Sequence, residues 1–353
     1  DKEHYLKPTA WVAAKNTPAY FLRNPSAMSN SFTLFGGSDK STYKLGYTRN
    51  TEQGMLPNSS LYKNIMNFNI NNQLTKKLTA GISANISFNG ANGRYGTGYD
   101  AKNPMTNFRQ WWQTNVDMKD LEDAFNRNKE RNTTWNWADY ANVGAGPIYW
   151  DNPYFVVAEN FKTQKLNRIV GNVGLNYKFN SHLSIQSNAR MNSYTNENDA
   201  RMATGSLTLP YYTQLQNQYK EMNYETNIVY KNKFGDFSVD GLAGGNIRRN
   251  SYSQMSLATQ GGLSSPNYFD IAASVARPSY SRSYEKKIVN SVYGKASFGF
   301  RDFLYVDGTI RNDWSSALPE ANNSYLYPSL SSSFIFTELL KINWLSYGKL
   351  RAS

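Results

Sequence analysis

Apolar and polar residues alternate along several stretches of the chain. In residues 78–88, Leu, Ala, Ile and Phe occupy every second position, with Thr, Gly, Ser and Asn between them. Successive side chains of a β-strand point to opposite sides. A strand formed by this segment therefore has one apolar and one polar face. The same alternation returns at 183–193 and 286–301, and it predicts a sheet with one apolar and one polar side.

About eleven segments follow this pattern, and many reach the ~9–11 residues that cross a bilayer at a tilt. A twelfth is expected to begin near Asn343. The eleven segments lie near 27–37, 40–50, 61–74, 77–90, 165–179, 182–196, 218–234, 236–254, 284–300, 303–313 and 325–337.

The connections between these segments alternate between short and long. The short ones lie near 37–39, 75–76, 180–181, 235 and 301–302, with a somewhat longer one at 338–342. The long ones lie near 51–60, 91–164, 197–217, 255–283 and 314–324. Outer-membrane barrels have tight turns on the periplasmic side and long loops outside. We therefore predict an all-β, transmembrane antiparallel β-barrel with long extracellular loops.

The longest connection, 91–164, differs from the others in composition. Pro104 suits the first position of a helix, and residues 117–125 carry an apolar helical stripe, so part of this loop is expected to be helical. Aromatic residues are concentrated here, which favours packed structure over disorder. Such side chains can pack the loop, contact another protein or bind a ligand, and all three interpretations stay open for Trp111, Trp112, Trp135, Trp137, Tyr149 and Trp150.

Composition excludes several other classes of protein. Charged residues make up 18% of the chain, below the ~25% of ordinary globular domains, while aromatic residues reach 15%. The net charge of +12 is spread without basic runs, so we expect attraction to anionic lipid and lipopolysaccharide surfaces and no nucleic-acid partner. No apolar run reaches the ~18–20 residues of a membrane helix.

The sequence offers little catalytic chemistry. Cysteine is absent and His4 and His182 are the only histidines, so we expect no metal site and no cofactor. His182 fits a plain turn residue. The glycines at 93, 96 and 98 are interpreted as a mobile loop, because no βαβ pattern surrounds them. We therefore expect that the protein is not an enzyme.

Three stretches resemble the SusC/RagA family of TonB-dependent transporters. The most specific runs from RNDWSSALPEANNSYLYPSLSSSFIFTELL at 311–340 to LSYGKLRAS at 345–353. A second is the hairpin within 31–58, with its GGSDKSTY turn, and a third is Trp150-Asp151-Asn152-Pro153-Tyr154. The three stretches occur in the same order as in the family, and together they span most of the chain.

The resemblance implies a barrel of about 22 strands around a plug domain. It also implies a SusD-like surface lipoprotein as lid and energy supplied through the TonB complex. We expect the chain to supply 11–12 of these strands, with 1–26 as an extracellular loop region and 27–353 as the N-terminal half of the barrel. The plug domain and the C-terminal strands are not expected in this chain.

The resemblance further implies TonB-dependent import of oligosaccharides or oligopeptides across the bacterial outer membrane. Two alternatives stay open: a non-transporting barrel that serves as a scaffold in a larger assembly, and a secreted β-rich glycan-binding protein. If the alternation holds, polar side chains line the lumen and contact plug or substrate; the candidates are Arg190, Lys295, Asp307 and Arg311.

Overall fold

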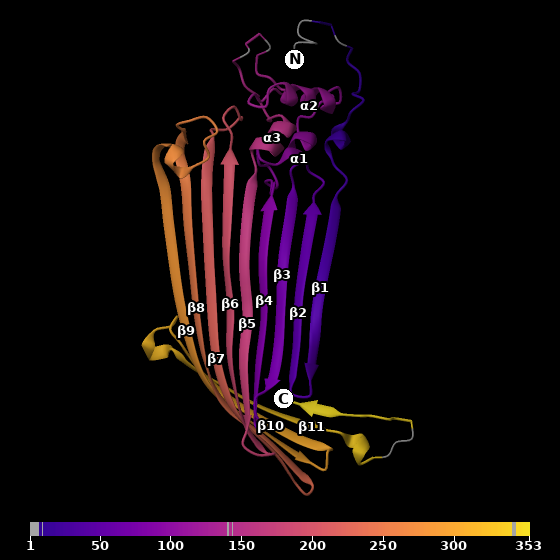
Figure 1. Cartoon of the computed structure of the whole chain (residues 1–353), viewed down its shortest axis with the longest axis vertical. Helices are drawn as coiled ribbons and strands as arrows, with labels where there is room; N and C mark the ends of the chain where they lie inside the picture. The colour runs from indigo at the N-terminus through magenta and orange to yellow at the C-terminus, as the bar shows by residue number, and fades with distance from the viewer. Residues whose placement is uncertain (1–6, 9, 140, 143, 341–343) are drawn as a thin grey trace.

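A computed structural model describes residues 7–8, 10–139, 141–142, 144–340 and 344–353. Its strands form one antiparallel sheet in which neighbours in sequence are neighbours in space, in the order β1 to β12 (Figure 1). The sheet is open between β1 and β12, as expected for part of a barrel. The strands are β1 Ser26–Ser38, β2 Ser41–Gln53, β3 Ser60–Gln73, β4 Leu78–Asn92, β5 Lys162–Lys178, β6 Leu183–Met202, β7 Tyr211–Phe234, β8 Phe237–Leu263, β9 Ser274–Phe300, β10 Leu304–Ser315, β11 Ser324–Phe334 and β12 Leu350–Ala352.

The eleven expected strands are all present, but the expected lengths of the central ones are wrong. β7 begins at Tyr211, β8 ends at Leu263 and β9 begins at Ser274. The expected loops 197–217 and 255–283 therefore shrink to 203–210 and 264–273. The added parts of these strands, such as residues 211–217 and 274–283, have polar and aromatic residues on both sides. They therefore show no alternation from which a strand could be predicted.

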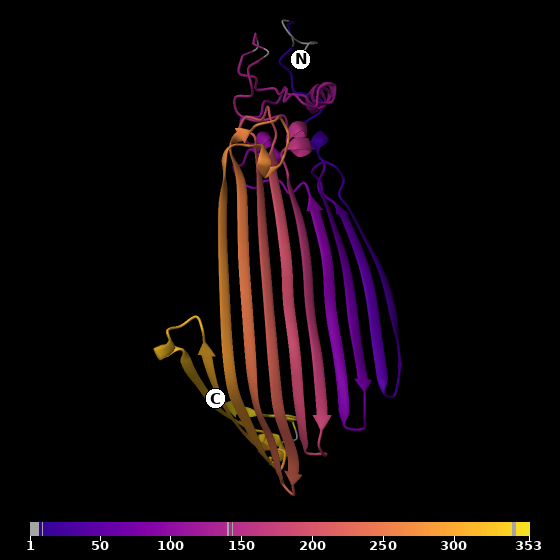
Figure 2. The ribbon, with the colours of Figure 1, turned by 60° about the vertical axis from the view of Figure 1, so that its left-hand side comes forward.

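The register of the sheet separates an apolar from a polar face. Residues paired across neighbouring strands lie on the same side, and Ile82 is paired with Ile70 on β3 and Val173 on β5. In the described part of the chain, no second layer covers this side along the strands (Figure 2), and its large side chains are exposed. They include Phe32, Leu34, Ile70, Ile82, Val173, Leu175, Ile228, Ile247, Val292, Phe298, Ile310, Leu326 and Leu330.

The helices begin where side chains cap them. α1 (Pro104–Arg109) has Pro104 at its start, as expected, and Asn103 accepts from the Met105 N–H. α2 (Met118–Arg127) is capped by Asp117. α3 (Pro153–Glu159) was not expected, although an Asn-Pro start is a recognisable helix signal. None of the helices in the described ranges is long and apolar enough to cross a membrane. The remaining turns are 3-10 helices at Pro18–Phe21, Ile271–Ala273, Glu320–Asn322 and Phe336–Glu338.

The hydrophobic core lies in the loops and not in the sheet. Of the buried apolar residues described, only Met202, the last residue of β6, belongs to a strand. Phe21, Met118, Leu121 and Val157 form one cluster. We call this end of the molecule the loop cap, seen above the strands in Figure 1. It comprises the connections 54–59, 93–161, 203–210 and 264–273 with the described part of 7–25.

Two expectations concern residues that the structure does not describe. The expected start of the twelfth strand near Asn343 lies outside the described residues, and the observed β12 pairs with Ser332–Phe334 of β11. His4 also lies outside them. His182, in contrast, is exposed at the start of β6, where its N–H donates to Asn180 Oδ1 at 2.8 Å. It is the turn residue that the sequence predicts.

Candidate functional site

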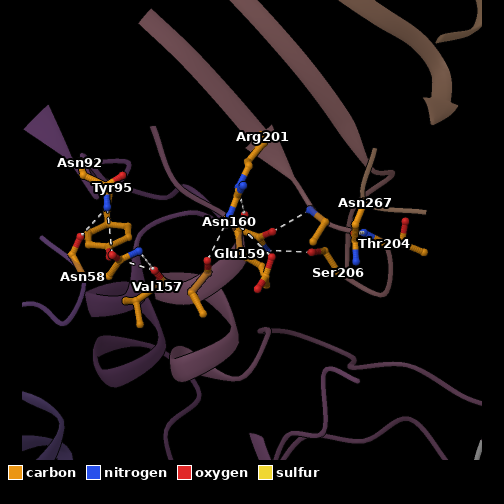
Figure 3. Close-up of polar contacts among 12 residues, drawn as sticks. Asn58, Asn92, Tyr95, Val157, Glu159, Asn160, Arg201, Thr204, Ser206 and Asn267 are labelled. Carbon is orange, nitrogen blue, oxygen red and sulfur yellow. Dashed lines mark hydrogen bonds and ion pairs between the residues drawn. The ribbon is translucent and has the colours of Figure 1, made fainter. Parts of the chain in front are cut away.

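The C-terminal end of α3 joins several connections of the loop cap (Figure 3). The last carbonyls of a helix have no partner within it. Here the Val157 carbonyl accepts from Asn58 Nδ2 at 2.8 Å and from the Tyr95 hydroxyl at 3.2 Å. Arg201, near the end of β6, donates through Nε to the Glu159 carbonyl at 2.9 Å. The helix end is therefore fixed by two connections and a strand.

Asn160 extends this network to the β6–β7 connection (Figure 3). Its side chain is fully buried; Nδ2 donates to Ser206 Oγ at 2.8 Å, and Oδ1 accepts from the Ala203 N–H at 2.8 Å. The Thr204 N–H donates in turn to Asn267 Oδ1 at 2.9 Å, in the β8–β9 connection. Side-chain hydrogen bonds therefore tie four separate connections into one unit.

Asp151 is a buried carboxylate at the centre of this unit. Its Oδ1 accepts from Asn132 Nδ2 at 2.6 Å and from the Leu207 N–H at 2.7 Å, while Oδ2 faces Asn160 Nδ2 at 3.3 Å. These donors are all neutral. Burial raises the pKa of Asp151 to about 6, and the hydrogen bonds oppose that shift. Asp151 belongs to the motif at 150–154. Its contact with Leu207 joins the connections 93–161 and 203–210, and this contact depends on the protonation of Asp151.

Asn152, the next residue, is fully buried and holds the start of α3. Its Nδ2 donates to the carbonyls of Leu121 at 2.9 Å and Thr133 at 2.8 Å, and its Oδ1 accepts from the Tyr154 N–H. Neither this role nor that of Asn160 was predicted. Asparagine is common throughout the sequence, so no local signal distinguishes the buried ones.

Most of the candidate aromatic residues pack the loop onto itself. Trp150 is buried and donates through Nε1 to the Gln110 carbonyl at 3.1 Å. Trp112 meets Trp135 edge to face, with ring centroids 5.9 Å apart. Trp137 lies under a guanidinium, 5.4 Å from its ring centroid, and donates through Nε1 to a loop carbonyl. Their geometry fits the loop-packing interpretation.

Trp111 and Tyr149 differ from the others, because their rings stack on the outside of the loop cap. Their centroids lie 5.2 Å apart at 13°, and the residues are 61% and 43% exposed. Trp111 has φ of +61°, a left-handed conformation that large residues rarely adopt. Tyr99, which the sequence did not single out, is 73% exposed and packs edge-on against Trp150. We call Tyr99, Trp111 and Tyr149 the aromatic surface.

The aromatic surface is held from below by buried groups. Asn136 Oδ1 accepts from the N–H of Tyr149 at 2.8 Å and of Trp150 at 3.1 Å. Trp150 in turn anchors Gln110, the neighbour of Trp111, and supports the ring of Tyr99. The backbone next to the exposed rings is therefore held by buried groups.

The four candidate lumen residues all lie on the polar face of the sheet. Arg190 on β6 forms an ion pair with Glu225 on β7, and the Tyr293 hydroxyl donates to the same carboxylate at 3.1 Å. Arg311 lies over the Tyr293 ring and pairs with Asp313 at 2.7 Å. Arg190 and Arg311 thus belong to one connected network.

Lys295 and Asp307 form a second pair on this face. Their Nζ and Oδ1 atoms lie 3.7 Å apart, and the Ser297 hydroxyl also donates to Asp307. The structure therefore joins Arg190 and Arg311 through one network, and Lys295 and Asp307 in one ion pair. A shallow hollow follows the polar face across β1 to β7 and is lined by side chains such as Lys44, Asn67, Asn85, Asn172 and Arg190.

The comparisons with known proteins define the class of fold. No family model matches the sequence, and no curated protein matches it in sequence. Solved structures do match: the fold is similar to that of the barrel of outer-membrane transporters. The ferric citrate transporter FecA in its unliganded form gives a TM-score of 0.53 at 8% identity, over 92% of this chain and 40% of that one.

The RagAB structures are more similar. The RagAB peptide importer in the 'open-open' state gives a TM-score of 0.76 at 14% identity, over 99% of this chain and 38% of that one. The RagAB peptide transporter gives 0.73 at 13% identity, over 92% and 36%. The expected barrel, its outer-membrane type and its resemblance to RagA-like transporters are confirmed at the level of the fold. The chain spans well under half of these transporters.

Proposed function

We propose that the chain forms part of a TonB-dependent importer that carries oligopeptides or oligosaccharides across the outer membrane. The observation that carries this proposal is a single sheet with one apolar and one polar face and a packed loop cap at one end. Such a sheet closes around a polar interior in lipid. The loop cap then stands where cargo enters. We propose that the protein transports its cargo and does not transform it.

The exposed apolar face argues against the secreted glycan-binding alternative. A soluble sheet must bury its apolar face against a second layer, and soluble monomers rarely expose such patches beyond a few hundred Å². In this sheet Ile228, Val292 and Leu330 are each more than half exposed. Lipid is the environment in which these side chains are stable.

We propose the aromatic surface as the contact for cargo or for a SusD-like lipoprotein lid. Flat, rigid aromatic rings are enriched among the residues that dominate binding energy. Peptide cargo is supported by the likeness to the RagAB peptide importer, and oligosaccharides are the second candidate because sugar rings also stack on such surfaces. We propose that the energy comes from the TonB complex acting on a plug inside the barrel. We also propose that the polar face of the sheet contacts this plug.

The test is growth of a strain that lacks the full-length gene. With oligopeptides of defined length as the only nitrogen source, or single oligosaccharides as the only carbon source, we expect growth to fail on one cargo class and recover on complementation. A TonB-deficient strain should show the same defect. Normal growth of the deletion strain on every cargo, with a disturbed outer-membrane assembly, would instead support the scaffold alternative.

A further inference from the structure

Three arginines surround a small hollow on the polar face. Arg190 comes from β6, Arg248 from β8 and Arg311 from β10, and all three line a cavity of about 260 Å³. Two carboxylates, Glu225 and Asp313, line the same hollow. The side chains that form it therefore carry a net charge of +1, three positive against two negative.

Both carboxylates are already engaged. Glu225 forms an ion pair with Arg190, and Asp313 accepts from Arg311 Nε at 2.7 Å. Arg248 is half-buried on β8, a strand that lies between those of Glu225 and Asp313 in the sheet. It forms no hydrogen bond and no ion pair with any residue in the described part of the chain. The excess positive charge of the hollow therefore resides on Arg248.

The neutral groups around Arg248 form their hydrogen bonds with other residues. Its cross-strand neighbour Asn223 uses Oδ1 to accept from Asn246 Nδ2 at 2.6 Å. The Tyr293 hydroxyl lies within donating distance of Glu225 Oε1, at 3.1 Å, and of Asn227 Oδ1, at 2.8 Å. An unpaired charge is costly once it is removed from bulk water. Closure of the barrel around this face therefore favours an external counter-charge here.

We propose that this hollow binds a carboxylate carried by a polypeptide segment. The guanidinium fork matches a carboxylate in a bidentate arrangement, and of the three arginines Arg248 is the one that donates to no described residue. The carboxylate comes either from a segment of the transporter that fills the barrel or from an acidic cargo peptide. The site needs the closed barrel but not the proposed import, because a scaffold barrel would also require the counter-charge.

Zero-length cross-linking tests the site in the full-length protein in outer-membrane vesicles. Arg248→Lys keeps the charge and adds an amine, which a carbodiimide couples to any carboxylate in contact with it. Arg249→Lys is the matched control, because Arg249 follows directly in sequence and lies exposed on the apolar face. We expect at least about tenfold more coupling at position 248 than at 249, given the strength of charge-assisted pairs. Mass spectrometry identifies the linked peptide.

The outcomes separate the two sources of the carboxylate. A link to another segment of the transporter without added peptide supports the internal source. A link that forms only with an added Asp-containing pentapeptide, and not with its Asn counterpart, supports the cargo. Glu221 also lies on the polar face of β7, two residues from Asn223. Coupling no greater than at position 249, or links only to Glu221, Glu225 or Asp313 of the sheet itself, would overturn the proposal. Because growth is not measured, failure here leaves the proposed import untouched.

Discussion

The wall of strands and the loop cap are stabilised by different means. In the wall, continuous backbone ladders join neighbouring strands, as between β8 and β9 from Phe237 onward, while the apolar side chains stay exposed. In the loop cap, buried side chains such as Asn152, Asn160 and Phe155 provide a small core and its hydrogen bonds. The wall therefore depends on lipid and on barrel closure, whereas the loop cap depends on its own packing. Substitutions should affect the two regions separately.

Trp150→Ala is expected to have the largest effect, and it should be confined to the loop cap. The change removes a buried ring, so the free energy of opening the cap should fall by about 3–5 kcal/mol. The loss of the Trp150 donor also leaves the Gln110 carbonyl without this partner. Hydrogen exchange of the full-length protein should show faster exchange within 93–161 and an unchanged wall. Equal acceleration in the strands would show instead that wall and cap unfold as one unit.

Ile82→Lys tests the wall in the same way. Ile82 lies on the apolar face and is 49% exposed, so a charge there enters the lipid and should lower the unfolding free energy by about 2–4 kcal/mol. Ser83→Lys is the control, because Ser83 lines the hollow of the polar face; its effect should stay below ~1 kcal/mol. Urea titration in lipid vesicles measures both. Equal losses would contradict the assignment of the two faces.

The pH dependence of the loop cap provides a smaller effect. The pKa of Asp151 is about 6 in the fold, above its unfolded value of 3.8, so the native state holds the proton more tightly. This contribution is fully present below the unfolded pKa and is lost as the pH rises through about 6. Between pH 5 and pH 7.5 the cap should lose about 1.4 kcal/mol.

The measurement is hydrogen exchange in the cap at both pH values, corrected for intrinsic rates. Asp151→Asn removes the titrating group and should abolish the difference between pH 5 and pH 7.5. The wall provides an internal reference within the same sample. A pH difference that persists in the Asp151→Asn variant would assign the effect to another group.

The two regions also differ in how far the sequence predicts them. The wall follows from alternation: residues 78–88 predict a strand, and β4 covers them. The loop cap is harder, because α1 and α2 have local start signals but the hydrogen bonds of Asn160 join residues far apart in the chain. Arg190, Lys295, Asp307 and Arg311 were placed on the polar face by parity alone, whereas their partners depend on strand register. The alternation along a strand predicts on which face of the sheet a side chain lies, but not which residues it contacts.

Trp111→Ala should have the smallest effect on stability and a clear effect on binding. The ring is mostly exposed, so the stability of the cap should change by less than ~0.5 kcal/mol. Loss of this exposed ring should weaken the binding of the proposed cargo or lid about tenfold. The left-handed backbone at Trp111 supports this expectation, because strain is typically retained where it serves function.

Tyr268→Ala provides the control for Trp111→Ala, since Tyr268 is 56% exposed in another connection of the same cap. Calorimetric titration of the full-length protein with oligopeptides, and separately with a SusD-like lipoprotein as the proposed lid, distinguishes the two proposed ligands. A loss with only one of them assigns the aromatic surface to that ligand. If Trp111→Ala behaves like Tyr268→Ala in both titrations, the aromatic surface is no binding site, and Trp111 then joins Trp112, Trp135 and Trp150 as a residue that only packs the loop.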